Sequence, residues 1–301
     1  MKFLVTGATG FIGKEIVKLI KKNNFELFTT SRSKSNNKNQ FQIPKKNVRE
    51  FFKKILFKIK PQYIIHLAGS LKSQSFAQSI KSNCYITYEI LSAIEECKLE
   101  NKVKSLIVGS AAEYGFVSKY KMPVTEETTI NPNSVYGLSK SIQSHIVSIF
   151  LNKNKNIIYV RPFNVIGKGM SEKLSIGNFS KKINLIKKKK IKNQIEILSP
   201  NAARDFIDVT DTAKIILKLI RNKESYGKCI NICSGKSVKI KEVLEYMISI
   251  SNQNIKIVPK KTNQKVQDMN IYFGDNKKLI QLIGNYEFIS WKNTVRRMIS
   301  Q

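Results

Sequence analysis

Short apolar runs alternate with longer segments of helical periodicity over the first two thirds of the chain. The runs expected to form strands are residues 2–6, 26–30, 63–67, 105–108 and 157–160. The segments expected to form helices are residues 11–22, 47–58, 79–97 and 134–151. This alternation indicates βαβ units and therefore a doubly wound parallel sheet with helices on both faces.

The last third of the chain has a different pattern. Residues 167–204 look irregular and basic, which is typical of an insertion over a site and not of a further strand. Beyond Cys233 the elements become shorter and no longer alternate cleanly. We therefore expect a large first unit and a smaller second lobe.

The composition limits the class of protein. With 42% hydrophobic residues in 301, the chain can bury a substantial core. No run of about 18 apolar residues occurs, so membrane insertion is not expected and the cytoplasm is the default location. The four cysteines form no Cys-x-x-Cys pair and only two histidines could join them, so neither zinc nor a disulfide framework is expected.

The formal net charge of +32 stands out, and its densest run is Lys187 to Lys190, just after Lys181-Lys182. Such charge can favour nucleic acid, an anionic membrane surface or a phosphorylated substrate. Aromatic residues do not interleave with the lysines, as a base-stacking surface would require. We therefore interpret the charge as a compositional bias and do not expect a nucleic-acid partner.

The first strand runs into a glycine-rich turn that opens the first helix. Gly7 suits a tight turn, Gly10 permits close approach of a pyrophosphate, and Gly13 permits close helix packing. The start of the helix offers unpaired N–H groups to phosphates. The expected cofactor contacts in this turn are Gly7, Thr9, Gly10, Phe11, Ile12 and Gly13.

The spacing Gly-x-x-Gly-x-x-Gly resembles the signature of the extended short-chain dehydrogenase/reductase superfamily, also called the NAD-dependent epimerase/dehydratase family. The resemblance implies a Rossmann-type domain that binds a nicotinamide dinucleotide. After the second strand the chain carries Ser31 and Arg32 and no carboxylate. An arginine there can pair with a 2′-phosphate, which favours NADP(H) and leaves NAD(H) as the alternative.

A Tyr-x-x-x-Lys pattern lies on the helix expected at residues 134–151. Residues i and i+4 share a helix face, so Tyr136 and Lys140 point the same way. An ammonium beside a phenol should lower the tyrosine pKa and prepare Tyr136 for proton transfer. Ser110 ends the strand 105–108 in a Gly-Ser turn, where its hydroxyl can hold the reacting carbonyl oxygen.

The family resemblance extends these assignments. Asn83 matches the helix asparagine that supports the proton-relay geometry, and Leu67, Ala68 and Gly69 match the segment that lines the cofactor. His66, directly before that segment, is interpreted as structural.

Further motifs resemble the nucleotide-sugar side of the family. Asn164, in Arg-Pro-Phe-Asn, matches a substrate-contacting asparagine, and Arg204, in Arg-Asp-Phe, matches an arginine that binds the diphosphate. A structural ion pair of Arg204 with a neighbouring aspartate is the alternative. Ala111 is expected beside the substrate, and Lys265 stands where such enzymes often have a second arginine.

Taken together, the motifs most resemble GDP-6-deoxy-D-mannose reductases and related NDP-4-keto-6-deoxyhexose reductases. The resemblance divides the chain into a dinucleotide-binding Rossmann domain, residues 1–166 plus 206–232, and a C-terminal substrate-binding α/β lobe, residues 167–205 plus 233–301. The 4,6-dehydratases of the family carry an acidic residue two positions after the serine. Ala112 stands there, and Glu113 is expected to aim elsewhere, so dehydration is disfavoured.

These observations predict NADPH-dependent reduction of a nucleotide-linked 4-keto-6-deoxyhexose. A 4-epimerase with tightly bound NAD is the alternative, and a non-catalytic RNA-binding member is a remote one. The family also implies a homodimer formed through a four-helix bundle of residues 79–97 and 134–151.

Overall fold

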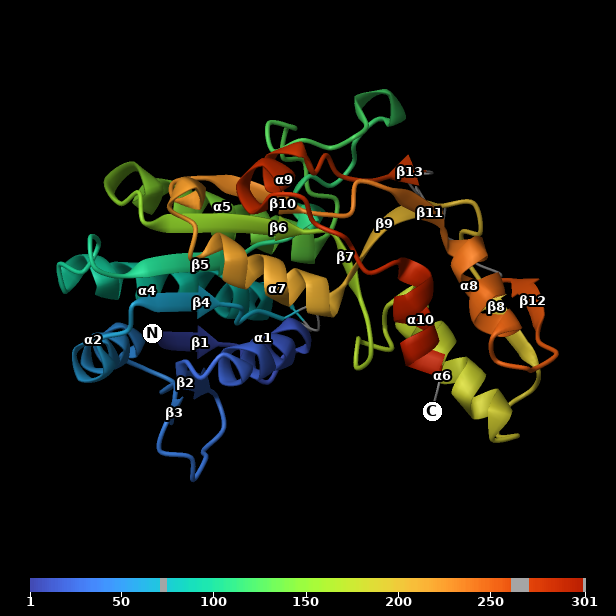
Figure 1. The fold of residues 1–301 in the computed structure, drawn as a ribbon, viewed down its shortest axis with the longest axis horizontal. Helices are drawn as coiled ribbons and strands as arrows, with labels where there is room; N and C mark the ends of the chain where they lie inside the picture. The colour runs from blue at the N-terminus through green and yellow to red at the C-terminus, as the bar shows by residue number, and fades with distance from the viewer. Residues whose placement is uncertain (71–74, 261–270, 300–301) are drawn as a thin grey trace.

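The computed structural model describes residues 1–70, 75–260 and 271–299, and its largest element is a sheet of seven strands (Figure 1). All its neighbouring strands pair in parallel. In spatial order they are β10 (Cys229–Ile232), β6 (Ile157–Pro162), β5 (Lys104–Val108), β4 (Tyr63–His66), β1 (Lys2–Thr6), β2 (Glu26–Ser31) and β3 (Gln40–Gln42). The order reverses between β1 and β4, which confirms the expected doubly wound sheet. In sheets of this type, ligands bind at the carboxyl ends of the strands beside such a reversal.

Helices cover both faces of this sheet. One apolar core joins the sheet to α1 (Phe11–Lys22), α7 (Val209–Leu219) and α9 (Lys277–Ile283). A second core joins the opposite face to α2 (Val48–Ile59), α4 (Ile86–Glu96) and α5 (Val135–Lys153). The strands are apolar along their length because both faces are buried, and every residue of β6 is buried.

The helix expected at residues 79–97 extends from Phe76 to Glu96 and is not uniform. It consists of α3 (Phe76–Ile80), a π-helical segment (Lys81–Tyr85) and α4. Insertions of this kind are frequent at functional sites. Here the wider turn contains Asn83, whose side chain is fully buried.

A smaller group of elements lies at the right of Figure 1, around β9 (Ala203–Asp208). Strands β7 (Asn164–Ile166) and β13 (Ile271–Tyr272) pair with β9 in parallel, and β11 (Ser237–Lys239) pairs with it antiparallel. Strands β8 (Gln194–Ile197) and β12 (Lys256–Pro259) form a separate parallel pair. Helices α6 (Ser175–Lys187), α8 (Ile240–Ser249) and α10 (Trp291–Ile299) pack together over a third apolar core.

The expectation of an irregular segment at residues 167–204 is wrong. It contains the three-turn helix α6 and the strand β8. Lysines obscured the helical period in the sequence, but they leave one apolar stripe intact. The buried members of that stripe are Ile176, Phe179, Ile183 and Ile186.

Three short 3₁₀-helices complete the described chain, at Ala111–Glu113, Lys119–Lys121 and Lys223–Ser225. Helix α9 lies within the range assigned to the second lobe. It packs, however, against helix α7 and against strand β10 of the main sheet. The division into two domains stays a prediction. Over the described residues, no helix is long and apolar enough to cross a membrane.

Candidate active site

The glycine turn joins β1 to α1 with the geometry that the sequence predicted. Gly7 has φ +70°, a conformation that favours glycine. A Cβ on Gly13 would lie 2.2 Å from the carbonyl oxygen of Gly7, so only glycine lets the helix approach this closely. Thr9 and Gly10 are exposed, and Phe11 and Ile12 are half-buried where α1 begins. No side chain of the described residues caps this helix start, which leaves its N–H groups suited to an anion.

The segment Leu67–Gly69 lies beside this turn. A Cβ on Gly7 would meet the backbone of Leu67 and Ala68 at 2.8 Å. The Leu67 N–H donates to the Thr6 carbonyl at 3.2 Å, and the Ala68 N–H donates to the Thr6 hydroxyl at 3.2 Å. The two segments expected to line the cofactor are therefore adjacent at the switch point of the sheet.

Ser31 ends the neighbouring strand β2, which pairs with β1 up to Thr6, and Arg32 follows the strand. Arg32 is exposed. The Ser31 hydroxyl donates to the Ser33 carbonyl at 2.6 Å and accepts from Gln40 at 2.9 Å. The hydrogen of the Ser31 hydroxyl is therefore engaged within the loop, whereas the Arg32 side chain is open to solvent.

Ser110, Tyr136 and Lys140 come together although they are distant in sequence. Ser110 follows β5 and caps the short helix Ala111–Glu113, and the other two lie on α5. The Ser110 side chain lies close enough to the Tyr136 hydroxyl to lower the pKa of that tyrosine. The Lys140 ammonium donates to the carbonyl of Val108, two residues before Ser110, at 2.9 Å.

The environment of Tyr136 corrects one expectation. Burial raises the pKa of Tyr136 to about 12, and the Ser110 side chain opposes this shift. Lys140 does not lower the pKa of Tyr136 here; its ammonium donates to the Val108 carbonyl at 2.9 Å and to the Gln143 side chain at 2.8 Å. Burial lowers the pKa of Lys140 itself to about 8.

Asn83 connects the cofactor segment to the catalytic helix. Its amide nitrogen donates to the Ser139 hydroxyl at 2.8 Å, and its oxygen accepts from the Ser70 N–H at 2.8 Å. A Cβ on Gly69 would lie 2.7 Å from that oxygen and 3.3 Å from the Lys140 ammonium. Gly69, Asn83 and Lys140 therefore meet at one point.

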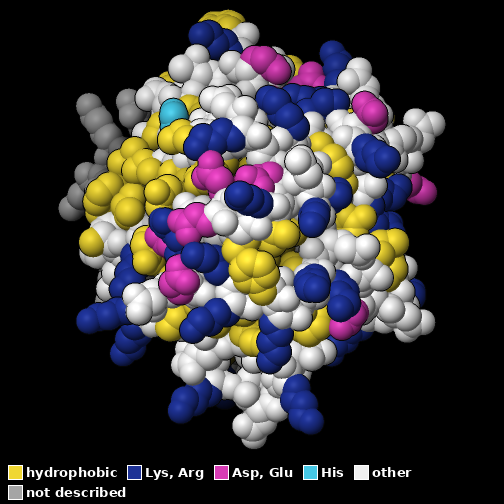
Figure 2. All heavy atoms as spheres, turned by 90° about the vertical axis from the view of Figure 1, so that its left-hand side faces the viewer, with side chains coloured by type: hydrophobic (Ala, Val, Ile, Leu, Met, Phe, Trp, Pro, Cys, Tyr) yellow, Lys and Arg dark blue, Asp and Glu magenta, His cyan; other side chains and the backbone are white. Residues whose placement is uncertain are grey.

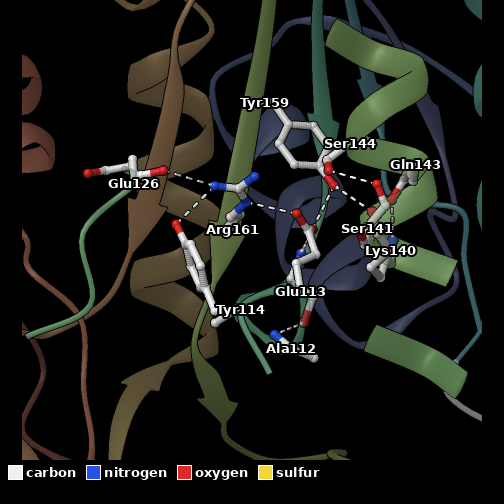
Figure 3. Close-up of polar contacts among 12 residues, drawn as sticks. Ala112, Glu113, Tyr114, Glu126, Lys140, Ser141, Gln143, Ser144, Tyr159 and Arg161 are labelled. Carbon is white, nitrogen blue, oxygen red and sulfur yellow. Dashed lines mark hydrogen bonds and ion pairs between the residues drawn. The ribbon is translucent and has the colours of Figure 1, made fainter. Parts of the chain in front are cut away.

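Sequence reasoning missed a buried charge network behind Ser110 (Figure 3). Glu113 is fully buried, and one of its oxygens accepts from the Ser110 N–H at 2.8 Å and from Tyr159 at 2.7 Å. The other oxygen forms an ion pair with the Arg161 guanidinium at 2.8 Å. Both carboxylate oxygens of Glu113 are therefore engaged within this network. The signal for this network was the Ser-x-x-Glu spacing, which is typical of a capping box.

The residues expected on the substrate side are less tightly gathered. The Asn164 amide donates to the Asp205 carbonyl at 3.0 Å, and Arg204 pairs in register with Tyr272 of β13. The Tyr272 hydroxyl donates to the carbonyl of Ala111, beside Ser110, at 2.8 Å. This bond joins β13, and with it β9, to the catalytic residues.

Two further predictions concern residues or groups outside this cluster. Lys265 lies outside the described residues. Within the part of the chain that the structure describes, no group of His, Cys, Asp and Glu could hold a metal ion. The four cysteines are free, with Cys84 and Cys233 buried.

A doubly wound sheet, a glycine turn at its switch point and a serine, a tyrosine and a lysine beside that turn define a nicotinamide-dependent enzyme of Rossmann type. The chain belongs to the NAD dependent epimerase/dehydratase family, whose model matches residues 3–233. This membership confirms the resemblance drawn from the sequence and the expected class of cofactor.

Individual relatives cover nearly the whole chain. It is 29% identical to GDP-6-deoxy-D-talose 4-dehydrogenase of Aggregatibacter actinomycetemcomitans, over 99% of this chain and 97% of the relative. It is 26% identical to GDP-6-deoxy-D-mannose reductase of Pseudomonas aeruginosa, over 80% of each chain. The solved structure of RMD from Pseudomonas aeruginosa complexed with NADPH has a TM-score of 0.80 and 23% identity, over 99% of this chain and 97% of that one.

Proposed function

We propose that the protein reduces the 4-keto group of a nucleotide-linked 6-deoxyhexose with NADPH. The observation that carries the proposal is the convergence of three side chains. Ser110 lies close enough to Tyr136 to shift its pKa, and the Lys140 ammonium of α5 donates to the carbonyl of Val108, two residues before Ser110. Two relatives support the choice of reaction, because their names describe a 4-dehydrogenase and a reductase of GDP-linked 6-deoxyhexoses.

The residues have distinct roles in this reaction. When bound, NADPH supplies a hydride to C4 of the sugar. Ser110 orients the carbonyl oxygen, and Tyr136 donates its phenolic proton to that oxygen as the C=O bond becomes a C–O single bond. Lys140 holds the nicotinamide ribose, and the Ser110 side chain, which opposes the rise of the Tyr136 pKa, stabilises the phenolate that remains on Tyr136.

The cofactor would be held at the switch point of the sheet. The pyrophosphate fits the start of α1, because Gly7 and Gly13 let the turn and the helix pack closely and no side chain among the described residues caps the N–H groups there. Leu67 to Gly69 line the other side, and Arg32 supplies a guanidinium to a 2′-phosphate. These placements favour NADPH over NADH.

The sugar nucleotide would lie between the catalytic residues and β9. We assign its diphosphate to Arg204 and Lys265, and contacts with the sugar to Asn164 and Ala111. Dehydration does not fit this site, since both oxygens of Glu113 are already engaged by Ser110, Tyr159 and Arg161.

The test is a screen of GDP-, dTDP-, UDP- and CDP-linked 4-keto-6-deoxy sugars with NADPH and NADH, followed by absorbance of the reduced nicotinamide. We expect stoichiometric consumption of NADPH with one of them. Interconversion of 4-epimers without net change in absorbance would instead identify an epimerase.

The Tyr136→Phe variant provides the residue-level test. Removing the phenolic proton should lower kcat by roughly 10²- to 10⁴-fold, the usual contribution of a general acid. The fold should persist, because the ring remains. Tyr246→Phe serves as the matched control, since that hydroxyl is bonded to Arg296 on the second lobe. Full turnover by Tyr136→Phe would refute the assignment.

We also propose a homodimer through α4 and α5. Apolar side chains are exposed on the face of these helices and on the segment before α4, and they gather at the left of Figure 2. The exposed members are Phe76, Tyr85, Tyr88, Val135, Leu138 and Ile149. Such a patch is typical of a protein–protein interface.

A further inference from the structure

A continuous chain of buried hydrogen bonds connects the strand before the glycine turn to Lys140. The Thr6 hydroxyl lies 2.7 Å from Nδ1 of His66, and Nε2 of His66 lies 2.9 Å from the Thr87 hydroxyl. The Gln143 amide nitrogen donates to the same Thr87 hydroxyl at 2.8 Å, and Oε1 of Gln143 accepts from the Lys140 ammonium at 2.8 Å. All five side chains are buried, and they come from β1, β4, α4 and α5.

The direction of the chain is fixed at its lysine end. An ammonium only donates, so the oxygen of the Gln143 amide must face Lys140 and its nitrogen must face Thr87. The single hydrogen of the Thr87 hydroxyl goes to the Asn83 carbonyl at 3.0 Å. The Thr87 oxygen therefore acts as an acceptor toward both Gln143 and His66.

This assignment determines the tautomer of His66. Nε2 must carry the hydrogen and donate to Thr87, while Nδ1 accepts from the Thr6 hydroxyl. The Thr6 oxygen in turn accepts from the Ala68 N–H. The opposite tautomer would point a second donor at Thr6 and draw the Thr87 hydrogen away from Asn83.

We propose that Gln143 is a positioning residue, whose amide is oriented by Thr87 and by the Nε2–H tautomer of His66 so that it holds the Lys140 ammonium in place. The proposal rests on the proposed function for its kinetic consequence. A buried ammonium stays charged only where acceptors surround it, and Gln143 and the Val108 carbonyl are two such acceptors. Burial together with Lys140 keeps His66 neutral, lowering its pKa to about 3.

The tautomer can be read from the protein alone by ¹⁵N NMR of histidine-labelled samples. The chain has two histidines, so His145→Gln removes the exposed one and assigns the signals of His66. We expect a protonated Nε2 and an unprotonated Nδ1 from pH 5 to 8. A protonated Nδ1, in either the other tautomer or the imidazolium, would overturn the proposal whether or not the proposed reaction is found.

The kinetic test uses Thr87→Val and Gln143→Met. Each should lower kcat roughly tenfold or more with KM nearly unchanged, and should shift the alkaline limit of kcat to lower pH as Lys140 loses an acceptor. Gln143→Glu keeps the acceptor and adds a negative charge, so it should shift that limit to higher pH.

Thr294→Val is the matched control, because Thr294, on α10, is also buried and donates to a side chain, that of Asp208. It should lose similar stability and keep the wild-type pH profile. If Thr87→Val and Gln143→Met also keep that profile, Gln143 does not position Lys140. If the wild-type enzyme turns over none of the sugar nucleotides, the proposed function fails, and the NMR result still decides the tautomer.

Discussion

At the scale of single residues, burial moves two pKa values in opposite directions: it raises the pKa of Tyr136 and lowers the pKa of Lys140. The pKa of Tyr136 rises to about 12, so its phenol stays protonated through the neutral range and is ready to act as an acid. The pKa of Lys140 falls to about 8, because burial disfavours its charged form more strongly than Glu113 favours it. The lysine, and not the tyrosine, should therefore set the alkaline limit of the reduction.

This difference predicts the pH profile. Lys140 is charged below its pKa and loses its proton as the pH rises through about 8, so kcat for reduction should be level near neutrality and fall above that pH. The measurement is kcat from pH 6 to 10 at saturating substrate. A rate that stays level to pH 10 would show that the Lys140 charge is not needed.

At the scale of elements, the sequence predicted the strands, helices and spacings that depend on the local pattern of hydrophobic residues. The strands of the main sheet are apolar runs, and the spacing of Tyr136 and Lys140 on α5 needed only the helical period. Helix α6 was missed because its lysines masked that period. The π-helical segment at Lys81–Tyr85 has no distinct hydrophobic pattern. The pairing of Glu113 with Arg161 joins residues 48 positions apart, so it could not be read from local spacing.

That pair leads to a prediction for stability. Glu113→Ala would leave the Arg161 guanidinium buried without its carboxylate, which typically costs about 3–5 kcal/mol of unfolding free energy. Glu95→Ala is the control, because the ion pair of Glu95 with Lys153 is exposed and should contribute less than about 1 kcal/mol. Urea unfolding followed by circular dichroism measures both. Equal, small losses would mean that the loss of Glu113 is compensated within the core.

At the scale of the whole molecule, the high positive charge opposes the proposed association. Lysine and arginine number 53 against 21 aspartate and glutamate, a net charge of +32 for each protomer. Two such protomers repel one another, and salt screens this repulsion over a Debye length of about 8 Å at physiological ionic strength. The apolar face of α4 and α5 must therefore supply enough buried area to exceed the repulsion.

The balance of these two effects can be measured. Dimer affinity, followed by analytical ultracentrifugation, should increase with salt, because screening weakens repulsion while apolar burial persists. Ile149→Lys adds charge to α5 where 60% of the isoleucine is exposed, and it should give monomers. Phe57→Lys adds the same charge at an equally exposed site on α2 and should leave the dimer intact. If both variants weaken association equally, net charge controls assembly; if neither does, the interface lies elsewhere.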